Sequence, residues 1–404
     1  MTFPRSNNYD VIIAGGGPAG SSLAIRLALN GKRVLLAEQK RFPREKLCGE
    51  FISPECLAQF AELGVLDQMM EPDGTRLTDT VFYSMRGRAV TVPSAWFGDG
   101  GQAALGLSRA EMDARLLARA RAVGIDVCEE TSVTRLIDEA GTIRGVQLRA
   151  ADRTEHAIRA ALTVDATGRG RALARLCANE NRRESTAAPF VAFKAHMVDA
   201  RIEPGHCEIY VYHGGYGGVN AIEGGRFNHC FIVRADLVRS LNNDAERVVR
   251  EVVMTNQRAN QTLVKAQTVT PWLAVALPWY GRRELIPQPG LITIGDAASF
   301  IDPFTGSGML MALESGEVAA AVILRWGGDA QALTSFADHY RHAYEQRFRQ
   351  RLRVSHWLRH AAFMPRLAAI LVRGLGRSKS LRRRLARATR NTNKLPETMA
   401  KPLV

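Results

Sequence analysis

The stretch DVIIAGGGPAG, residues 10–20, joins a short apolar run to a glycine-rich turn. The run at residues 10–15 ends in glycine and is typical of a buried strand in a parallel sheet. The next segment, residues 18–30, places apolar side chains on one face of a helix. A second apolar run, residues 33–38, ends in a glutamate. The sequence therefore predicts a strand–helix–strand unit with short connections.

The turn at residues 15–20, GGGPAG, fits the pattern GxGxxG at the junction of strand and helix. In such a turn the first glycine allows the tight bend, the second lets the backbone approach a pyrophosphate, and the third lets helix and strand pack closely. The helix N-terminus also offers free N–H groups and a positive dipole end to phosphates. We therefore predict a dinucleotide site formed by Gly15, Gly17, Pro18, Ala19, Gly20 and Glu38.

An acid at the end of the second strand binds a ribose 2′-hydroxyl and repels a 2′-phosphate, which is the role expected of Glu38. The alternative interpretation is a glycine-rich turn without a function. The strand, the helix and Glu38 in register argue against that alternative. The unit alone does not distinguish NAD from FAD.

Composition places the chain among ordinary globular proteins. It has 404 residues, 46% of them apolar and 23% charged, which excludes disordered, collagen-like and disulfide-scaffold proteins. At ~100–200 residues per domain, two or three domains are expected. The six cysteines are scattered without a CxxC pair, and the chain starts with a polar segment rather than a secretory signal. These features predict reduced thiols and a cytoplasmic location, and no apolar run approaches the ~18 residues of a membrane helix.

The formal net charge of +14 is concentrated at the C-terminus. Residues 347–404 hold 13 Arg and 3 Lys against the single acid Glu397. A basic segment of this kind indicates an anionic partner surface or serves solubility, and no nucleic-acid-binding motif accompanies it. Residues 355–377 mix bulky apolar residues with arginines and could lie on anionic lipid. The alternative, which we favour, is a pair of helices packed on the nucleotide-binding domain with a solvated arginine face.

Between these regions the pattern changes to short strands separated by glycine-rich turns, at residues 190–198, 207–213, 217–222 and 229–234. No long helix separates them, which predicts an antiparallel sheet inserted into the first domain. Ser108 and Glu111 form a capping-box pattern that opens a helix through Val123. Residues 244–258 are expected to be helical, as is the chain from Asp296 to about residue 390.

Three segments together resemble a known family: GGGPAG at residues 15–20, VDATG at residues 164–168 and GDAASFIDPFTGSGM at residues 295–309. They are similar to the flavoprotein hydroxylases related to p-hydroxybenzoate hydroxylase, and the same triple occurs in geranylgeranyl reductases and flavin halogenases. The resemblance covers roughly residues 8–325. It implies non-covalently bound FAD in an α/β fold, with a discontinuous Rossmann-like FAD-binding domain, an inserted antiparallel substrate domain and a helical C-terminal region.

The implied boundaries give the FAD-binding domain residues 1–73, 101–170 and 286–330, the substrate domain residues 74–100 and 171–285, and the basic helical region residues 331–404. By the same resemblance, the carboxylate of Asp296 binds flavin ribityl or ribose hydroxyls. The small residues before the following helix let its N–H groups reach the flavin. The implied FAD contacts are Arg109, Ala166, Gly168, Gly295, Asp296, Pro303, Gly306, Ser307, Gly308 and Met309.

The segment REKLCGEFISP, residues 44–54, resembles the KxCG segment of geranylgeranyl reductases, which runs along the flavin and substrate cavity. Lys46 and Cys48 are therefore included among the predicted cofactor-binding residues. For Cys48, the alternative is a small buried apolar side chain. The run GGYGG, residues 214–218, resembles a sheet segment on the substrate side of the flavin, with an ordinary hairpin turn as its alternative.

The resemblance implies a flavin monooxygenase that uses NAD(P)H and O₂ on an aromatic or polyketide-like small molecule. No second GxGxxG is present, so NAD(P)H is expected to dock transiently. The alternative is a geranylgeranyl-reductase-like enzyme that reduces or desaturates an isoprenoid or lipid. Halogenation is disfavoured because the WxWxIP signature is missing. A flavin-binding interaction protein is the non-enzymatic alternative. No catalytic residue and no metal site are predicted.

Overall fold

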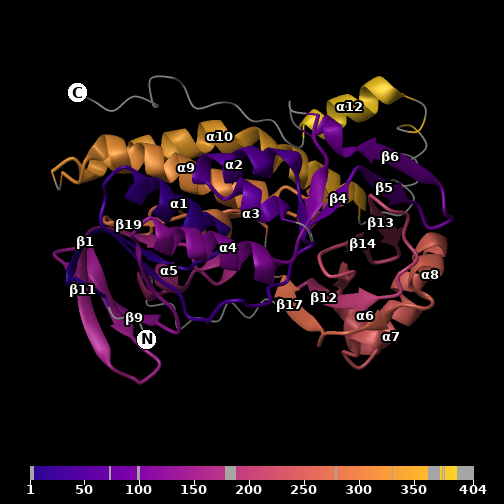
Figure 1. Ribbon diagram of the computed structural model, residues 1–404, viewed down its shortest axis with the longest axis horizontal. Helices are drawn as coiled ribbons and strands as arrows, with labels where there is room; N and C mark the ends of the chain where they lie inside the picture. Colours follow the sequence, from indigo (N-terminus) through magenta and orange to yellow (C-terminus); the bar gives the residue numbers. More distant parts are fainter. Residues whose placement is uncertain are drawn as a thin grey trace.

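The computed structural model describes residues 4–71, 74–97, 101–177, 188–277, 280–329, 331–362, 374, 376 and 378–388. Two large sheets form its framework, with the longest helices covering one side of the first sheet (Figure 1). The mixed α/β architecture confirms the predicted fold class. The domain boundaries given above remain a prediction.

The first sheet contains the predicted strand–helix–strand unit. Strand β1 pairs in parallel with β2 on one side and with β11 on the other, and β19 extends the parallel set beyond β11. The hairpin of β9 and β10 continues the sheet in antiparallel fashion. In the order of the chain the strands are β1 Asn8–Ala14, β2 Val34–Ala37, β8 Asp126–Cys128, β9 Ser132–Glu139, β10 Thr142–Arg149, β11 Glu155–Asp165 and β19 Leu291–Thr293.

The helices of this domain pack in layers on the sheet (Figure 1). They are α1 Pro18–Leu29, α2 Pro54–Leu63, α3 Leu66–Met70, α4 Arg109–Ala122, α5 Ala172–Cys177 and α9 Gly308–Trp326. Helix α9 crosses α1 closely because Gly316 has no side chain: a Cβ atom there would lie 2.8 Å from the carbonyl oxygen of Ala19. This close approach fixes the N-terminus of α9 beside the glycine-rich turn.

The second sheet is built from the strands predicted for the insertion. Its order is β16-β12-β15-β14-β13-β5-β6, with β17 also paired to β12. All its pairs are antiparallel except β5 with β13, which run in parallel because β5 comes from a different part of the chain. The strands are β5 Asp79–Tyr83, β6 Ala89–Pro93, β12 Phe190–Val198, β13 His206–Tyr212, β14 Gly215–Ala221, β15 Phe227–Arg234, β16 Gln267–Thr268 and β17 Leu273–Leu277.

Short elements complete the framework. Strands β3 Phe51–Ile52, β4 Thr75–Leu77 and β7 Ala104–Gly106 form one small sheet, and β18 Gly281–Arg282 pairs with β20 Ser299–Phe300. The short helical turns are η1 Ser94–Trp96, η2 Gly168–Gly170, η3 Val253–Thr255, η4 Gly295–Ala297 and η5 Pro303–Thr305. Helices α6 Ala235–Ser240, α7 Ala245–Glu251 and α8 Gln257–Leu263 lie against the second sheet (Figure 1).

Three helical predictions need correction. The chain is not helical directly from Asp296, because strand β20 follows and α9 begins only at Gly308. The segment 244–258 is not one helix: it breaks at η3, and Asn256 starts α8 by accepting hydrogen bonds from the N–H groups of Arg258 and Ala259. The capping box before α4 is only half formed. Ser108 Oγ accepts from Glu111 N, but Ser108 N donates to Glu223 Oε2 at 2.8 Å, a long-range partner that the local pattern does not reveal.

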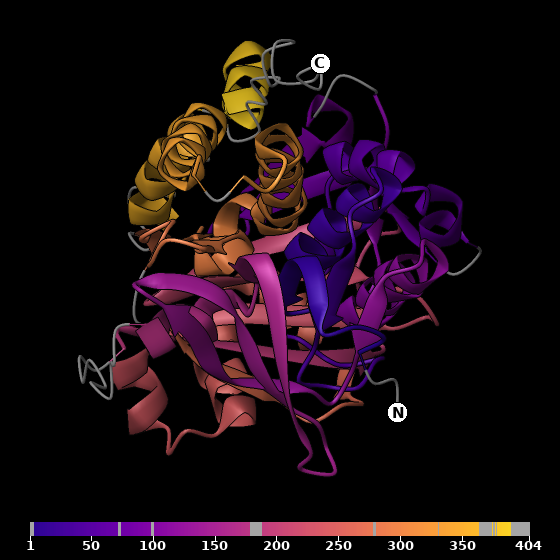
Figure 2. The same ribbon diagram turned by 90° about the vertical axis from the view of Figure 1, so that its left-hand side faces the viewer.

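The C-terminal region forms α10 Leu333–Ala362 and α12 Lys379–Ala388. Helix α10 lies along α9, as Figures 1 and 2 show. Its arginines are not all solvated as expected, because Arg347 and Arg351 are buried and pair with Glu314 on α9 at 3.0 and 2.6 Å. Residues 363–373 of the proposed lipid-facing segment lie outside the described residues. Among the described residues, no helix has the length and apolarity needed to cross a membrane.

Candidate active site

A cavity of about 670 Å³ lies between the two sheets. On one side it is lined by the ends of β1 and β11 and by the turns that follow them; on the other it is lined by β13, β14 and β15. The carboxyl ends of the parallel strands meet at this edge, which is where α/β sheets bind ligands. Of the predicted cofactor-binding residues, all except Gly20 and Ser307 line it.

The glycine-rich turn has the geometry that the sequence predicts. Gly15 has a φ of +110°, and a Cβ atom there would lie 2.3 Å from the carbonyl oxygen of Ala166. Gly20 does not face the cavity because it packs helix to strand: its Cβ atom would lie 1.9 Å from the carbonyl oxygen of Gly15. At Gly17 the nearest atoms to such a Cβ are arginine nitrogens 3.8 Å away. The backbone at Gly17 is therefore open to a ligand, at the N-terminus of α1.

Positive charge surrounds this turn. Arg44, Lys46, Arg109 and Arg169 all line the cavity. The Arg109 side chain is only 11% exposed and binds Asp113 through Nε and Nη2 at 2.8 and 2.7 Å, so it is not a surface arginine. Burial lowers the pKa of Arg109, but the adjacent carboxylate outweighs burial, and the net shift is upward. Such a fixed cation beside a helix N-terminus suits a diphosphate.

Glu38 braces the turn from the neighbouring strand. Its Oε2 accepts a hydrogen bond from Gly16 N at 2.9 Å, and its Oε1 accepts one from Lys40 N at 2.9 Å. The side chain is buried and also lines the cavity. Glu38 thus holds the backbone of the turn in place, a role that the sequence pattern alone did not indicate.

One aspartate ends a parallel strand and another follows one at the same sheet edge, and their side chains have different contacts. Asp165 is fully buried, and its carboxylate accepts hydrogen bonds from the backbone N–H groups of Thr167, Leu173 and Ala174, so it anchors the start of α5. Asp296 instead lines the cavity. Burial raises its pKa, and Arg169, Arg109 and Lys46 counter that shift.

The segment after Asp296 forms the floor of the cavity. Pro303 starts η5, which Asp302 caps by accepting a hydrogen bond from Phe304 N at 3.0 Å. Gly306 then takes the left-handed conformation with a φ of +61°, which glycine adopts without strain. Ser307 is buried and is the N-cap residue of α9. Gly308 and Met309 line the cavity in the first turn of α9, whose N-terminus favours negative charge.

The motif VDATG, residues 164–168, lines the cavity through small residues that carry no charge, Ala166 and Gly168. Both residues follow β11.

Cys48 also lines the cavity, from the loop before β3, and its Sγ accepts a hydrogen bond from Glu50 N at 3.4 Å. Burial raises the pKa of Cys48, so the sulfur is a neutral thiol near neutral pH.

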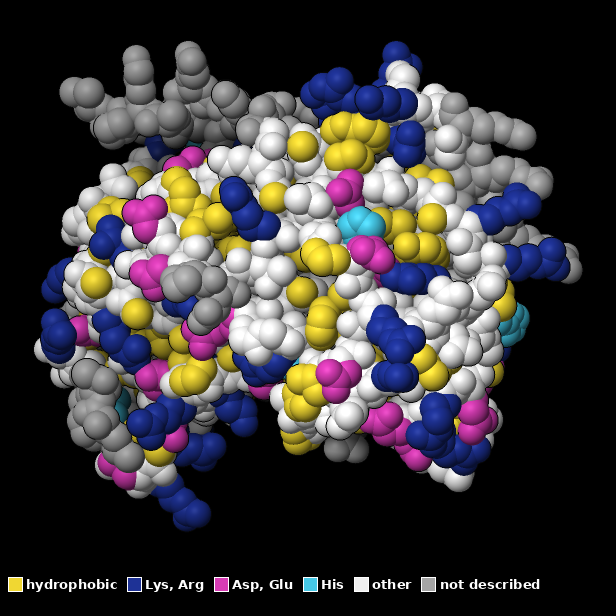
Figure 3. All heavy atoms as spheres, turned by 45° about the vertical axis from the view of Figure 1, so that its right-hand side comes forward, with side chains coloured by type: hydrophobic (Ala, Val, Ile, Leu, Met, Phe, Trp, Pro, Cys, Tyr) yellow, Lys and Arg dark blue, Asp and Glu magenta, His cyan; other side chains and the backbone are white. Residues whose placement is uncertain are grey.

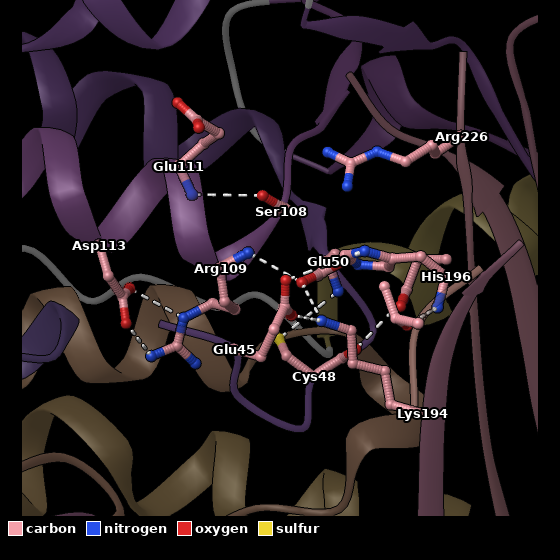
Figure 4. Close-up of polar contacts among 12 residues, drawn as sticks. Glu45, Cys48, Glu50, Ser108, Arg109, Glu111, Asp113, Lys194, His196 and Arg226 are labelled. Carbon is pink, nitrogen blue, oxygen red and sulfur yellow. Dashed lines mark hydrogen bonds and ion pairs between the residues drawn. The ribbon is translucent and has the colours of Figure 1, made fainter. Parts of the chain in front are cut away.

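A cluster of charged residues beside Cys48 was not predicted (Figure 4). Lys194 and His196 on β12 meet Glu45 and Glu50 of the loop before β3, and all but Glu45 are fully buried. Glu45, Glu50 and His196 lie close enough to ligate a metal ion. However, the ammonium group of Lys194 already lies 2.5 Å from Glu45 and 2.6 Å from Glu50, and supplies the positive charge there. Only the fold could reveal this cluster, because its members are about 150 positions apart.

One part of the cavity wall, called the aromatic end below, is formed by aromatic side chains. Phe82, Tyr216 and Phe304 line it, with Phe304 in edge-to-face contact with Tyr216 at 5.1 Å and tilted against Phe82 at 5.6 Å. The Tyr216 hydroxyl donates a hydrogen bond to Asp302. The segment GGYGG is thus the start of a central strand, β14, and not a simple hairpin turn.

Comparison with known proteins agrees with this site. Residues 8–350 match the family model described as an FAD binding domain, and the chain belongs to that family. It is 26% identical to a menaquinone reductase of Mycolicibacterium smegmatis, over 79% of this chain and 77% of that protein. It is 27% identical to a digeranylgeranylglycerophospholipid reductase of Methanosarcina acetivorans, over 85% and 81%. A solved flavin-dependent brominase shares the fold with a TM-score of 0.79 and 20% identity, covering 95% of this chain and 93% of that one.

The protein is therefore an FAD-dependent oxidoreductase. The residues present fit the cofactor: the open backbone at Gly17 and the nearby arginines suit the diphosphate, and Asp296 offers an acceptor for hydroxyl groups. When bound, FAD supplies the redox chemistry, and the protein supplies orientation and exclusion of water.

Proposed function

We propose that the protein is a flavin monooxygenase that hydroxylates an aromatic, polyketide-like small molecule with NAD(P)H and O₂. Our proposal rests chiefly on the aromatic end of the cavity, where the side chains of Phe82, Tyr216 and Phe304 line the wall. Aromatic rings prefer edge-to-face and offset contacts with one another. A planar substrate ring would be held there by such contacts, with apolar side chains excluding water.

The proposed substrate pocket also contains a few polar side chains that could orient the substrate. Thr80 and Asn220 line the same part of the cavity, and Asn220 Nδ2 is within 3.3 Å of the backbone oxygens of Glu50 and Ala221. A pocket that is mostly apolar with a few placed polar groups is typical of small-molecule sites. A phenolic hydroxyl is one group that these side chains could orient.

The test measures NAD(P)H oxidation and O₂ uptake by the holoprotein with a panel of alkylated phenols and resorcinols. We expect a ligand that fits the aromatic end to stimulate both rates together and to yield a product with one added oxygen atom. Replacing Phe304 by alanine should weaken that stimulation without loss of FAD. Equal rates with and without every aromatic ligand would contradict the proposal.

A second candidate is the reduction of a double bond in an isoprenoid or other lipid. The similarity to the menaquinone reductase and the digeranylgeranylglycerophospholipid reductase favours it, as does the position of Cys48 in the cavity wall. This activity would proceed without O₂ and add two hydrogen atoms to the substrate. A polyprenyl probe incubated anaerobically with reduced holoprotein distinguishes the two functions.

Helix α12 packs beside a part of the cavity wall that we assign to the substrate in this proposal. Ala386 packs in one apolar cluster with Phe97 and Cys207, which line the cavity, and Arg382 donates to the carbonyl oxygen of Thr91 at 2.9 Å. Deleting the chain from Arg377 onward should therefore leave the FAD content unchanged. It should weaken binding of aromatic ligands, measured by quenching of flavin fluorescence. Loss of FAD from the folded truncated protein would contradict this assignment.

We also propose peripheral contact with anionic lipid through this region. Lys and Arg side chains gather beside hydrophobic ones at the top of the face in Figure 3, at the height of α12 in Figure 1. Leu381 is 51% exposed beside exposed Arg383 and Arg384, and Trp357 on α10 is 78% exposed. Cosedimentation with vesicles containing phosphatidylglycerol should fall when Trp357 and Leu381 are replaced by serine. Equal cosedimentation of the variant and the parent protein would rule this contact out.

A further inference from the structure

Three side chains form a polar row across the inner face of the second sheet: Thr80, Cys207 and Asn220. Thr80 on β5 and Asn220 on β14 are both cross-strand partners of Cys207, which lies between them on β13. Partners on neighbouring strands point to the same side of a sheet, and all three residues line the cavity. The next row on this face begins with Phe82 and Ile209, which are apolar. The cavity wall therefore changes from polar to apolar along the strands.

The amide of Asn220 is oriented so that its oxygen remains available. Its Nδ2 lies 3.3 Å from the carbonyl oxygens of both Glu50 and Ala221, and these two acceptors fix which end of the amide is the nitrogen. Oδ1 accepts no hydrogen bond within the part of the chain that the structure describes. Because the side chain lines the cavity, the wall offers a hydrogen-bond acceptor at this point and asks for a donor from the ligand.

The hydroxyl group of Thr80 has no structural use. Thr80 is 6% exposed, and its Oγ1 is buried without a hydrogen-bond partner among the described residues. A buried hydroxyl without a partner is unfavourable, because it has given up its hydrogen bonds to water. Since Thr80 lines the cavity, rotation about its Cα–Cβ bond to another staggered rotamer can present the hydroxyl to a ligand. A ligand oxygen would supply the missing partner.

The polar row carries no charge. Thr80 and Asn220 do not ionise, and burial raises the pKa of Cys207 to about 12, so its thiol stays protonated near neutral pH. A carboxylate or ammonium group placed against the row would lose its hydration and gain no charged partner there. Hydroxyl groups fit instead, because a hydroxyl both donates and accepts hydrogen bonds without a charge.

The spacing between the polar row and the aromatic end sets the length of the ligand. Phe82 lies two residues beyond Thr80 on β5, and Tyr216 lies four residues from Asn220 on β14. Both offsets run in the same direction, because β14 is antiparallel to β13 whereas β5 is parallel to it. At ~3.4 Å per residue they correspond to ~7 and ~14 Å. A ring at the aromatic end is therefore separated from the polar row by at least one further ring.

We propose that the polar row binds an oxygenated end of the substrate while the aromatic end of the cavity holds a ring ~7 Å or more away. A ligand hydroxyl donates to Asn220 Oδ1, and a ligand oxygen accepts from Thr80 Oγ1. The two residues lie two strand spacings apart, ~10 Å, so the row spans the edge of a ring that carries more than one oxygen. The ligand class is an extended, uncharged, polyhydroxylated aromatic molecule. This subsite deepens the proposed function and rests on it.

The test measures the affinity of the holoprotein for three ligands by quenching of flavin fluorescence. In 5-phenylresorcinol the two hydroxyl groups lie one ring away from an unsubstituted ring; its dimethyl ether lacks the donors, and biphenyl lacks the oxygens. We expect Asn220→Leu to reduce the preference for 5-phenylresorcinol over its ether by roughly two- to tenfold, the net contribution of one neutral hydrogen bond.

Thr80→Val should reduce the preference for 5-phenylresorcinol over biphenyl by a similar factor. Its apoprotein should unfold at the parent temperature or above, because the lost hydroxyl had no partner. Thr91→Val is the matched control and should keep both preferences, since Thr91 pairs with Val81 and points to the other face of the sheet.

Parent-level preferences in folded Asn220→Leu and Thr80→Val would overturn the subsite. Failure of all three ligands to bind would overturn both the subsite and the proposed function. If the preferences change as expected but 5-phenylresorcinol gains no oxygen with NAD(P)H and O₂, the subsite is supported and the hydroxylase alone is contradicted.

Discussion

Replacing Asp296 by alanine is expected to weaken FAD binding by roughly 10- to 150-fold, while the apoprotein keeps its thermal stability. The carboxylate lines the cavity, and a hydrogen bond to a charged group contributes about 1.5–3 kcal/mol. Since ~1.4 kcal/mol corresponds to a tenfold change in affinity, one lost bond accounts for that range. Asp296→Asn should be milder, because the amide oxygen still accepts a hydrogen bond. Titration of apoprotein with FAD, followed by flavin fluorescence, measures the change.

Asp165 provides the matched comparison for Asp296. It is the last residue of a parallel strand at this edge, but its carboxylate accepts hydrogen bonds from backbone N–H groups at the start of α5. Asp165→Ala should therefore lower the melting temperature of the apoprotein. If Asp296→Ala instead lowers that melting temperature and leaves FAD affinity unchanged, Asp296 is a structural residue and the site assignment is wrong.

The second large effect is expected at the glycine-rich turn. Substitution of Gly17 should abolish FAD binding, whereas substitution of Gly20 should destabilise the fold. Gly20→Ala places a methyl group 1.9 Å from the carbonyl oxygen of Gly15, so strand and helix must separate and the apoprotein itself should be strongly destabilised. Gly17→Ala meets no atom closer than 3.8 Å, and the backbone there is extended with a φ of −73°. Its methyl group instead occupies the space left for the diphosphate.

We therefore expect Gly17→Ala to unfold at the same temperature as the parent apoprotein yet to be purified without yellow colour. Gly20→Ala should unfold at a much lower temperature. Calorimetry of both apoproteins and the absorbance of bound flavin give the two readouts. Parent-level flavin in Gly17→Ala would contradict placement of the diphosphate at α1, whatever the behaviour of Gly20→Ala.

The sequence predicted best those parts of the fold that depend on local pattern. The strand–helix–strand unit and the strands of the second sheet follow from short-range periodicity and spacing, whereas the role of Gly295 and Asp296 is what the family resemblance implies. The positions of Gly15 and Gly20 follow from sterics that any such turn imposes. Most of the predicted cofactor-binding residues line the cavity, and the majority of them came from the family resemblance rather than from local pattern.

What the sequence did not predict depends on partners distant in the chain. Arg351 reads as a solvated arginine in a basic helix, but Glu314 on α9 makes it a buried ion pair. The backbone N–H of Ser108 donates to Glu223 instead of completing the capping box with Glu111. Lys194 has the pattern of an ordinary strand residue, and only the fold brings Glu45 and Glu50 into contact with it. Ion pairs between residues far apart in the chain produce no short-range sequence pattern from which they could be predicted.

The proposed hydroxylation is tested most directly by the origin of the oxygen in the product. Reduced holoprotein is mixed with the aromatic ligand that best stimulates NAD(P)H oxidation, under an atmosphere of ¹⁸O₂, and the product is analysed by mass spectrometry. We expect one ¹⁸O atom in each product molecule and no product without O₂. A product that forms anaerobically with two added hydrogen atoms, and carries no ¹⁸O, would contradict the hydroxylase and establish the reductase in its place.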